Sequence, residues 1–309
     1  MTSATVVIVA NPASGRGRST AAATELAARL SIHGVSTIIV CGSSAADARA
    51  QLADAVFEHK PTAVVACGGD GTVNMCLQAV AGTNIALGIL PVGTGNDNAT
   101  ALRVPQNPRE AGDLIADAIG REAYAVVDAA RAMAADGTSS WFLGVLSSGF
   151  DSRVNSRANS MTWPTGQARY VAAIVAELRV FKAAHYDVEF DADLPTRHSI
   201  SKPGMLVAVA NGPQYGGGMQ VAPDALMDDA LLDVTFLDEL TAPTFLRVFP
   251  SVYAGTHVRR PEVHQYRATT VTIHAANQTA YADGELVGPL PVQIEIVPSA
   301  LRVLTRPPS

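Results

Sequence analysis

The first 130 residues or so repeat one pattern: a short apolar run, a glycine-rich turn and an alanine-rich amphipathic stretch. Four apolar runs have the length of strands, namely Thr5–Ala10, Val35–Val40, Thr62–Cys67 and Ile85–Leu90. Helices are predicted between them, across Thr20–Leu30, across Ala45–His59 and from the turn after the third strand to about Ala81. This alternation predicts a parallel sheet covered on both faces, which binds ligands at the carboxyl ends of its strands. Three glycine-rich turns follow three of the strands, so we expect them along that one edge.

After about Ala130 the pattern changes to short β-branched runs separated by turn residues. The strand-like runs are Trp141–Ser147, Tyr186–Asp191, Met205–Ala210, Leu231–Leu237, Thr269–His274 and Val292–Val297. One helical stretch interrupts them between Gln167 and Lys182, and its apolar face consists of Tyr170, Ile174, Leu178 and Phe181. We therefore predict an α/β domain over residues 1–130 and a mainly antiparallel β-sandwich over residues 131–298. A last strand-like run in residues 299–309 could belong to either domain.

Composition narrows the functions open to this chain. It has 28 acidic and 22 basic residues, a net charge of -6, which argues against nucleic acid and against firm adsorption to an anionic membrane. No apolar run approaches the roughly 20 residues that span a bilayer, and the N-terminus lacks a secretory signal. We expect a cytoplasmic protein. The cysteines, Cys41, Cys67 and Cys76, have neither the spacing of a zinc site nor that of a disulfide framework.

The segment Gly68–Asn74, Gly-Gly-Asp-Gly-Thr-Val-Asn, follows the third predicted strand. Glycine lets backbone N–H groups approach a phosphate closely, and the N-terminus of the following helix favours an anion. Asp70 would repel a phosphate unless a cation intervenes, which indicates Mg²⁺ between the carboxylate and the phosphates. An ordinary strand-to-helix turn is the alternative, but it gives no reason for Asp70 and Thr72. The segment predicts a nucleotide-phosphate site.

The segment Pro91–Asp97 repeats this chemistry after the fourth strand. Thr94 and Asn96 offer neutral donors to a phosphate, and Asp97 suits a metal ion or a water that the ion holds. The motif is weak alone and much stronger beside Gly68–Asn74.

The segment Asn11–Gly17 is neither of the common nucleotide fingerprints. It lacks the Gly-Lys-Ser/Thr ending of a Walker A loop and the third glycine of a dinucleotide-binding turn, which makes a dehydrogenase a weak reading. The chain's three lysines lie outside the glycine loops, so positive charge on the phosphates must come from Mg²⁺ or from Arg16 and Arg18.

Two acidic clusters lie in the predicted sandwich. Asp224–Asp233 embeds adjacent carboxylates in apolar sequence, and Tyr281–Glu285 presents an acid at a tight turn between strands. Either could be a solvated turn, which is the commoner explanation for such a segment.

Taken together, these motifs resemble the diacylglycerol kinase catalytic family, in particular the bacterial lipid kinases related to sphingosine and ceramide kinases. The resemblance covers essentially the whole chain in the family's order. Its motifs are Asn11-Pro12-x-Ser14-Gly15, Gly68–Asn74, Pro91-x-Gly93-Thr94-Gly95-Asn96-Asp97, Asn211-Gly212 with Gly216–Gly218, Asp228-Asp229 and Asp283-Gly284-Glu285. The resemblance implies an N-terminal domain like that of phosphofructokinases and NAD kinases, a C-terminal β-sandwich and an active site in the cleft.

Carried over by position, the resemblance implies the roles of individual residues. ATP would be bound by Asn11, Ser14, Gly15, Gly68, Gly69, Asp70, Gly71, Thr72, Val73, Asn74, Gly93, Thr94 and Asn96. Glu285 would be the general base for the lipid hydroxyl, and Asp70 would take part in catalysis. A structural Mg²⁺ would be held by the Asp229 side chain and the backbone carbonyls of Leu226 and Leu231. Ordered water would join that ion to Asp70, Asp97 and Asp128.

The chain departs from the family at a few positions. Ala230 follows the acidic pair where the family often has glycine, so a positive φ there would strain the loop and weaken the metal site. Asn98 replaces a common phenylalanine with no evident chemical consequence. Around Cys41–Ser44, where the family usually offers a threonine to the nucleotide, the alignment is too loose to carry over a role.

Two other functions stay open. An NAD kinase shares the Gly-Gly-Asp-Gly-Thr loop, and a non-catalytic nucleotide-binding protein would share the phosphate sites. Pro91–Asp97 and the intact Asp283-Gly284-Glu285 turn favour a lipid kinase. The expected partner is a lipid alcohol such as diacylglycerol, reached through transient peripheral contact with the inner face of the membrane, and the resemblance leaves room for a homodimer.

Overall fold

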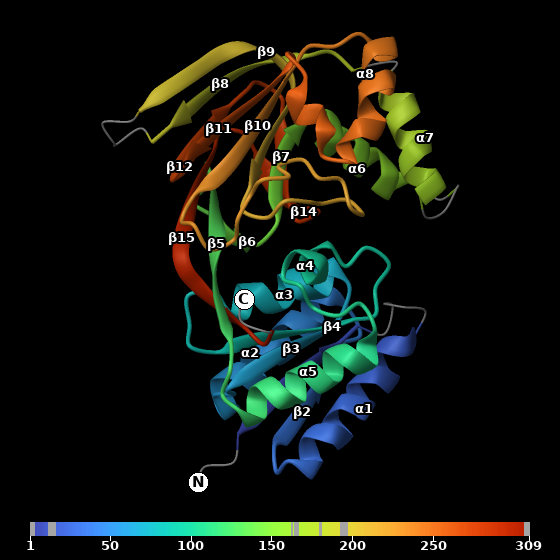
Figure 1. Cartoon of the computed structure of the whole chain (residues 1–309), viewed down its shortest axis with the longest axis vertical. Coiled ribbons are helices and arrows are strands. Elements are labelled where there is room, and N and C mark those ends of the chain that lie inside the picture. Colours follow the sequence, from blue (N-terminus) through green and yellow to red (C-terminus); the bar gives the residue numbers. More distant parts are fainter. Residues whose placement is uncertain are drawn as a thin grey trace. The chain divides into compact units, whose positions relative to one another are not determined.

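The computed structural model describes residues 4–11, 17–161, 163, 167–178, 181–191 and 197–305. The chain divides into two compact units (Figure 1). The first comprises Met1–Ala129 and Val297–Ser309, and the second comprises Ala130–Ile296. Two long strands, β5 (Ala125–Ala134) and β15 (Val292–Val303), have residues in both units.

The first unit is built on a parallel sheet. Its strands lie in the order β15, β4 (Ala86–Pro91), β3 (Ala63–Gly68), β1 (Thr5–Ala10) and β2 (Ser36–Val40), and each neighbouring pair is parallel. Every residue of β3 and β4 is buried, as are Val6–Ala10 of β1. Continuous apolar strands of this kind are what a parallel sheet covered on both faces requires. The predicted α/β fold of this part of the chain is confirmed.

Helices cover the sheet in pairs. Contacts join α1 (Arg18–Ile32) to α5 (Pro108–Gly120), and α2 (Ala45–His59) to α3 (Asp70–Val80) (Figure 1). Their starts follow from the sequence: the Ser44 side chain accepts the backbone N–H of Asp47, and Asn107 accepts that of Arg109. A short helix, α4 (Asp97–Ala101), follows β4.

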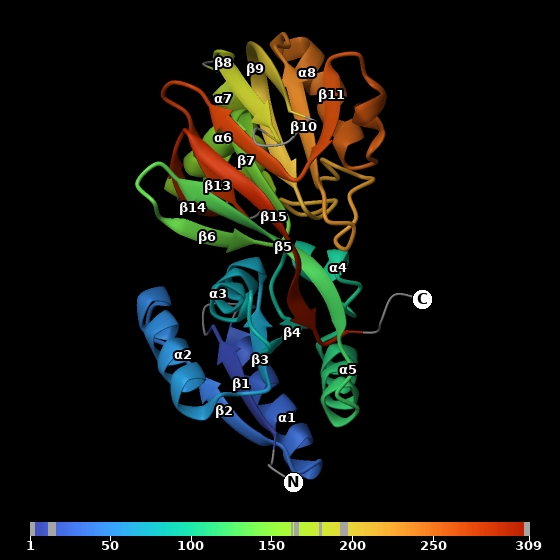
Figure 2. The same ribbon diagram turned by 90° about the vertical axis from the view of Figure 1, so that its left-hand side faces the viewer.

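In the second unit, nine strand pairs that the structure describes within residues 130–296 are antiparallel. Its further strands are β6 (Ser139–Phe142), β7 (Val145–Gly149), β8 (Ala184–Phe190), β9 (His198–Ala210), β10 (Leu232–Asp238), β11 (Val263–Ala268), β12 (Thr270–His274), β13 (Thr279–Ala282) and β14 (Glu285–Pro289). In β8, Tyr186, Val188 and Phe190 are buried and alternate with exposed residues, the pattern of a strand with one face on a core. The predicted antiparallel β-rich second domain is confirmed, and Figure 2 shows β14, β13 and β7 side by side.

One predicted strand was wrong in its extent. Trp141–Ser147 is two strands, β6 and β7, separated at Leu143–Gly144. The reason is a carboxylate far along the chain: Asp283 accepts the backbone N–H groups of Leu143, Gly144 and Val145 at 2.8, 3.0 and 3.1 Å. These donors are therefore taken by a side chain at the point where the chain turns.

The prediction of a single helical stretch in the second domain was also wrong. The unit contains α6 (Phe150–Ser160), α7 (Gln167–Leu178) and α8 (Ala242–Val248), followed by two 3₁₀ turns, η2 (Phe249–Val252) and η3 (Thr256–Arg259). Ile174 and Leu178 of the predicted apolar face pack in a cluster with Phe150 and Phe245. None of the helices in the described parts of the chain is long and apolar enough to cross a bilayer.

Candidate active site

The first glycine loop joins β3 to α3. Gly68 ends the strand, Gly69 is the extended N-cap residue, and the backbone N–H groups of Thr72 and Val73 donate to the Gly69 carbonyl. A Cβ on Gly68 would lie 2.1 Å from the Thr72 hydroxyl, so this position admits no larger residue without movement. The buried Thr72 hydroxyl has no hydrogen-bond partner among the described residues.

The second glycine loop lies directly against the first. The backbone N–H groups of Val92 and Gly93 donate to the Gly68 carbonyl at 3.1 and 3.3 Å. A Cβ on Gly93 would lie only 2.5 Å from the Gly69 Cα, so the two backbones touch where both glycines stand. The sequence prediction placed these loops on one edge of the sheet, and here the loops of β3 and β4 share that edge.

Asp70, the first residue of α3, is oriented by the second loop. Its Oδ1 accepts the backbone N–H of Asn98 at 3.1 Å and the Asn98 side-chain amide at 3.3 Å. Its Oδ2 faces Gly95, where an added Cβ would lie 3.0 Å away. Asn98 itself is buried. Asn98 has no evident role in the sequence alone, because its partner, Asp70, lies 28 residues earlier in the chain.

The other polar residues of the second loop differ in their surroundings. Thr94 is exposed, and Asp97, the first residue of α4, is half-buried. Asn96 holds a left-handed backbone with φ 58°, and its amide donates to the Gly93 carbonyl at 3.3 Å. The buried Asn96 Oδ1 has no partner among the described residues.

Several predicted nucleotide residues contribute little exposed side chain. Val73 and Asn74 are buried within α3. A ligand at this helix would therefore contact its exposed first turn, which includes Gly71. Asn11 follows β1, and its carbonyl accepts the Ser19 hydroxyl at the start of α1. Ser14 and Gly15 lie outside the described residues, as does Arg16.

These features of the first unit fit a phosphate group. Two glycine backbones in contact form a surface that side chains would block, and a helix N-terminus favours negative charge. Within the described part of the chain, the buried Thr72 hydroxyl and Asn96 Oδ1 lack hydrogen-bond partners, and both border the same loops. The carboxylate of Asp70, at the start of α3, lies against Asn98 and Gly95 of the second loop.

Asp283, Gly284 and Glu285 form the turn of the β13–β14 hairpin. Asp283 and Gly284 have φ of 49° and 84°, and Ala282 pairs with Glu285 across them, which is the geometry of a two-residue type I′ turn. The Asp283 carboxylate is occupied by the three N–H groups of residues 143–145. Asp283 therefore fixes the hairpin, and Glu285 is the exposed carboxylate at the start of β14.

Asp229 lies in the loop before β10 and pairs with an arginine. Its Oδ2 contacts the Arg267 guanidinium, and its Oδ1 accepts the Leu231 backbone N–H at 3.2 Å. The Arg267 Nε also lies 3.4 Å from an oxygen of Asp233. Burial is the main cause that raises the pKa of Asp233 above its usual value, and the Arg267 charge partly offsets it.

The same loop contains the residues that were predicted to hold a metal ion. Ala230 has φ 61°, so the residue adopts the positive φ that we expected to strain this loop. The described residues contain no group of three or more acidic, histidine or cysteine side chains that could hold a metal. The predicted set has one carboxylate, Asp229, with two backbone carbonyls, and Arg267 already pairs with that carboxylate. The donor set as it stands does not fit a metal ion unless Arg267 moves away.

The three acids predicted to join that ion through water all lie in the first unit. Asp70 and Asp97 begin helices, and Asp128 is buried on β5. The Asp128 Oδ1 accepts the Ser299 backbone N–H at 2.7 Å, at a residue of β15 with φ 56°. Asp128 thus has a structural contact of its own.

Comparison with known proteins places these features in a family. The sequence matches the diacylglycerol kinase catalytic domain over residues 5–132 and the YegS C-terminal NAD kinase beta sandwich-like domain over residues 144–305. A diacylglycerol kinase of Mycobacterium tuberculosis is 39% identical over 300 residues, which cover 97% of this chain and 94% of that protein. A protein of Stenotrophomonas maltophilia named as a YegS-like lipid kinase is 30% identical, with 83% of this chain and 82% of that protein covered.

The fold agrees with these sequence matches. A crystal structure of a diacylglycerol kinase from Bacillus anthracis has a TM-score of 0.70 and 21% identity, and the match covers 98% of this chain and 97% of that one. The chain therefore belongs to the diacylglycerol kinase family and is a lipid kinase.

Proposed function

We propose that this kinase transfers the γ-phosphoryl group of ATP to the hydroxyl of diacylglycerol or a similar lipid alcohol, giving phosphatidic acid or a related lipid phosphate. The observation that carries the proposal is the arrangement around Asp70, a carboxylate held by Asn98 beside two glycine loops in contact. A phosphate site with a fixed carboxylate and no lysine suits a nucleotide that arrives with its own cation. The M. tuberculosis relative, named a diacylglycerol kinase, supports the choice of acceptor.

The first unit would bind and position the nucleotide. The start of α3 and the two loops offer backbone N–H groups to the phosphates, with Thr94 and Asn96 as neutral side-chain donors. Phosphoryl transfer depends on alignment and on stabilisation of charge more than on covalent chemistry by the protein. Mg²⁺ bound to ATP would neutralise phosphate charge, and Asp70 is the carboxylate placed to hold it.

Glu285 would accept the proton of the lipid hydroxyl. An alcohol is a poor nucleophile at neutral pH, so a carboxylate within hydrogen-bond reach of it is useful as a base. Glu285 is suited to this because its side chain is exposed at the start of β14. Asp283 anchors the hairpin turn through its hydrogen bonds to residues 143–145, and this turn would keep Glu285 in a constant orientation.

The structural Mg²⁺ at Asp229, Leu226 and Leu231 is a separate part of the proposal. It requires Asp229 to exchange its contact with Arg267 for the ion. No step of the phosphoryl transfer is assigned to this ion.

Three incubations distinguish the candidate functions. Each contains the purified chain, Mg²⁺ and ATP labelled on its γ-phosphate, and they differ in the acceptor, which is lipid extract with dioleoylglycerol, NAD, or none. We expect label in a chloroform-soluble product that migrates as phosphatidic acid when dioleoylglycerol is supplied. Label in NADP instead would identify an NAD kinase. Nucleotide binding with no transfer to any acceptor would identify a non-catalytic nucleotide-binding protein.

Access to the lipid is proposed to occur through transient peripheral contact at the inner face of the membrane, from the cytoplasm. Trp163 and Leu286 are large apolar side chains that are 81% and 64% exposed, and Leu286 is adjacent to Glu285. Residues 162 and 164, on either side of Trp163, lie outside the described residues. Met161 is half-buried against the cluster around Phe150. A homodimer remains part of the proposal.

A further inference from the structure

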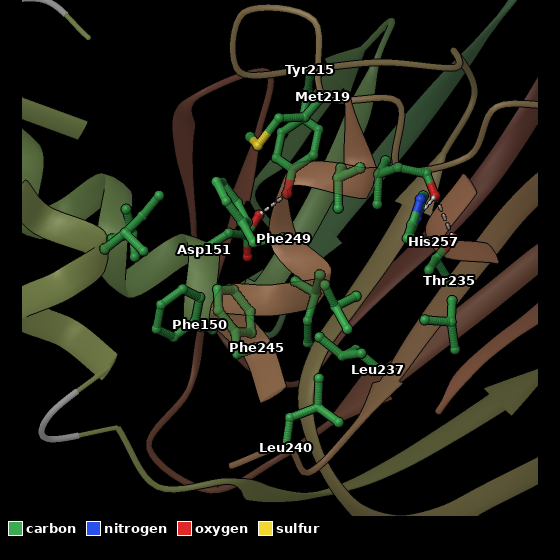
Figure 3. Close-up of a pocket in the computed structure, with 17 residues that line it drawn as sticks. Phe150, Asp151, Tyr215, Met219, Thr235, Leu237, Leu240, Phe245, Phe249 and His257 are labelled. Atoms are coloured by element: carbon green, nitrogen blue, oxygen red, sulfur yellow. Dashed lines mark hydrogen bonds between the residues drawn. The ribbon is translucent and has the colours of Figure 1, made fainter. Parts of the chain in front are cut away.

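The Asn211-Gly212 motif has no role in the function proposed above. Asn211 follows directly after β9, the strand that pairs with both β7 and β10, and it is 1% exposed. It begins a loop that continues to Tyr215 and Met219, which line an apolar pocket of the second unit (Figure 3). The motif could therefore support this loop, or it could act on the segment that its own hydrogen bonds reach.

The hydrogen bonds of Asn211 and Gly212 reach the turn between β6 and β7. The Asn211 side-chain amide donates to the Leu143 carbonyl at 2.8 Å. The backbone N–H groups of Asn211 and Gly212 donate to the Gly144 carbonyl at 2.9 and 3.0 Å. Leu143 and Gly144 are buried, so loss of a donor here would leave a polar group without solvent to replace it. The motif thus holds two consecutive carbonyl groups.

The same two peptide groups donate to Asp283 from their other side. The peptide group with the Leu143 carbonyl also contains the Gly144 N–H, which donates to the Asp283 Oδ1 at 3.0 Å. The peptide group with the Gly144 carbonyl contains the Val145 N–H, which donates to the same oxygen at 3.1 Å. A peptide group is planar and rigid, so one that is held at both its oxygen and its N–H cannot rotate freely. Hydrogen bonds in such a chain also polarise and strengthen one another.

This relay, from the Asn211-Gly212 motif through the two peptide groups to Asp283, ends at the turn before Glu285. Asp283 and Gly284 are the turn residues, and the Asp283 N–H donates to the Val145 carbonyl at 3.1 Å. Both the side chain and the backbone of Asp283 are therefore attached to residues 143–145. Glu285 follows two residues later, so the orientation of the turn decides the direction of its carboxylate.

We infer that Asn211 is a positioning residue for phosphoryl transfer, which acts on Glu285 through the relay. The inference rests on the proposed function for the role of Glu285 as a base, and on the hydrogen bonds themselves for the relay. Without the Asn211 amide, the peptide group between Leu143 and Gly144 is held at its N–H alone, and its rotation would move a donor away from Asp283. A displacement of about 1 Å at a reacting group can lower the rate about 100-fold.

Asn211→Ala tests the inference by steady-state kinetics, because it removes the side-chain donor and keeps the backbone donor. We expect kcat for transfer from Mg-ATP to dioleoylglycerol to fall by at least about tenfold. The KM for each substrate should stay within about twofold of wild type, because Asn211 is too buried to contact either one. A raised KM for the lipid with an unchanged kcat would show that Asn211 supports the pocket loop instead, and it would overturn the inference.

Thr235→Val is the matched control. Thr235 is 2% exposed, and its hydroxyl donates at 2.9 Å to the carbonyl of Val221, in the loop that Asn211 begins (Figure 3). The control therefore loses a buried hydrogen bond to the same loop but no bond of the relay. It should lower the unfolding temperature much as Asn211→Ala does and leave kcat unchanged. An equal fall of kcat in both variants would reject the relay as the cause.

A double variant tests whether Asn211 acts through Asp283. Asp283→Ala releases the far end of the relay, so Asn211→Ala combined with it should be no slower than the slower single variant. Losses that multiply would show that the two residues act independently, contrary to the inference. Asn211→Ser, which keeps a polar group at the site, replaces Asn211→Ala in each experiment if circular dichroism shows that the alanine variant does not fold.

Hydrogen exchange of backbone amides tests the relay without turnover. In peptides that cover residues 140–147 and 280–288, exchange measured by mass spectrometry should be about fivefold faster in Asn211→Ala than in wild type, and unchanged in Thr235→Val. Wild-type exchange of residues 280–288 in Asn211→Ala would refute the relay.

The proposed function and this inference fail separately. Loss of transfer in Glu285→Gln with a wild-type kcat in Asn211→Ala would retain the base and reject the positioning residue. Full transfer in Glu285→Gln with faster exchange of the hairpin in Asn211→Ala would reject the base and retain only the relay.

Discussion

Ala230 occupies a backbone conformation that alanine resists, and replacing it with glycine should stabilise the protein. Its φ is 61°, in the loop between Asp229 and Leu231. A left-handed conformation costs an L-residue about 1–2 kcal/mol, whereas glycine adopts it without that cost. The greater conformational entropy of glycine in the unfolded chain reduces this stabilisation by about 0.4–1 kcal/mol. The expected net gain for Ala230→Gly is therefore about 0.5–1 kcal/mol.

Thermal unfolding measures this gain directly. For a domain of about 150–250 residues, 1 kcal/mol shifts the midpoint by about 2–4 °C, so Ala230→Gly should raise it by about 1–4 °C. Ala254→Gly is the matched control: Ala254 is exposed and is not among the positive-φ residues, so the same substitution there should lower stability by about 0.4–1 kcal/mol. A fall of similar size in both variants would refute the reasoning, because it would show that Ala230 carries no conformational cost.

Three further predictions concern Asn98, Arg267 and the buried ring of His257. Asn98→Ala should raise the KM for Mg-ATP by about tenfold, because Asp70 loses the side-chain amide donor at 3.3 Å. An unchanged KM would show that Asn98 does not position Asp70. Arg267→Gln removes the cation that pairs with Asp229, so Mg²⁺ should raise the unfolding temperature of the variant more than that of wild type. An equal effect of Mg²⁺ on both proteins would count against the proposed metal site. For His257, whose folded-state pKa is lowered by burial, the unfolded chain takes up a proton first, so stability should fall as pH drops below about 6.5. Urea unfolding of wild type and His257→Gln at neutral and mildly acidic pH should show a smaller loss in the variant, and equal losses would exclude His257 as the cause.

Much of the first unit could be predicted because its strands are buried on both faces. The runs at β1, β3 and β4 are apolar throughout, and they lie at or within one residue of their predicted bounds. Helix α2 begins and ends as predicted, at Ala45 and His59, since Ser44 gives a side-chain cap and Lys60 ends it in a left-handed conformation. Local chemistry determines these elements, so local sequence is sufficient to find them.

The second unit was harder to predict because distant residues decide its elements. Gly144 is a single glycine inside an apolar run, which indicates at most a bulge, and the break between β6 and β7 depends on Asp283, about 140 residues away. Helix α6 is rich in polar residues, and its two buried apolar side chains one turn apart, Phe150 and Val154, are too few to establish a helical period. Its start at Phe150 is stabilised by packing with Phe181 and Phe245 from later segments.

In the candidate site too, some features depend on local sequence and others on contacts between distant residues. The glycine loops were found from sequence, because backbone approach to a phosphate restricts the residue types that can occupy them. The contact between Asn98 and Asp70, and that between Arg267 and Asp229, join residues 28 and 38 positions apart. No spacing rule connects such pairs, so they became visible only in three dimensions.

The central proposal is that Glu285 is the base for a lipid hydroxyl. Transfer of the labelled phosphate from Mg-ATP to dioleoylglycerol, measured together with ATP affinity, tests it in Glu285→Gln and in Glu189→Gln, an exposed control on β8. We predict that Glu285→Gln loses transfer by at least about 100-fold while ATP affinity stays within about twofold of wild type, and that Glu189→Gln leaves both unchanged. Retained transfer in Glu285→Gln, or an equal loss of transfer and ATP affinity, would contradict the account.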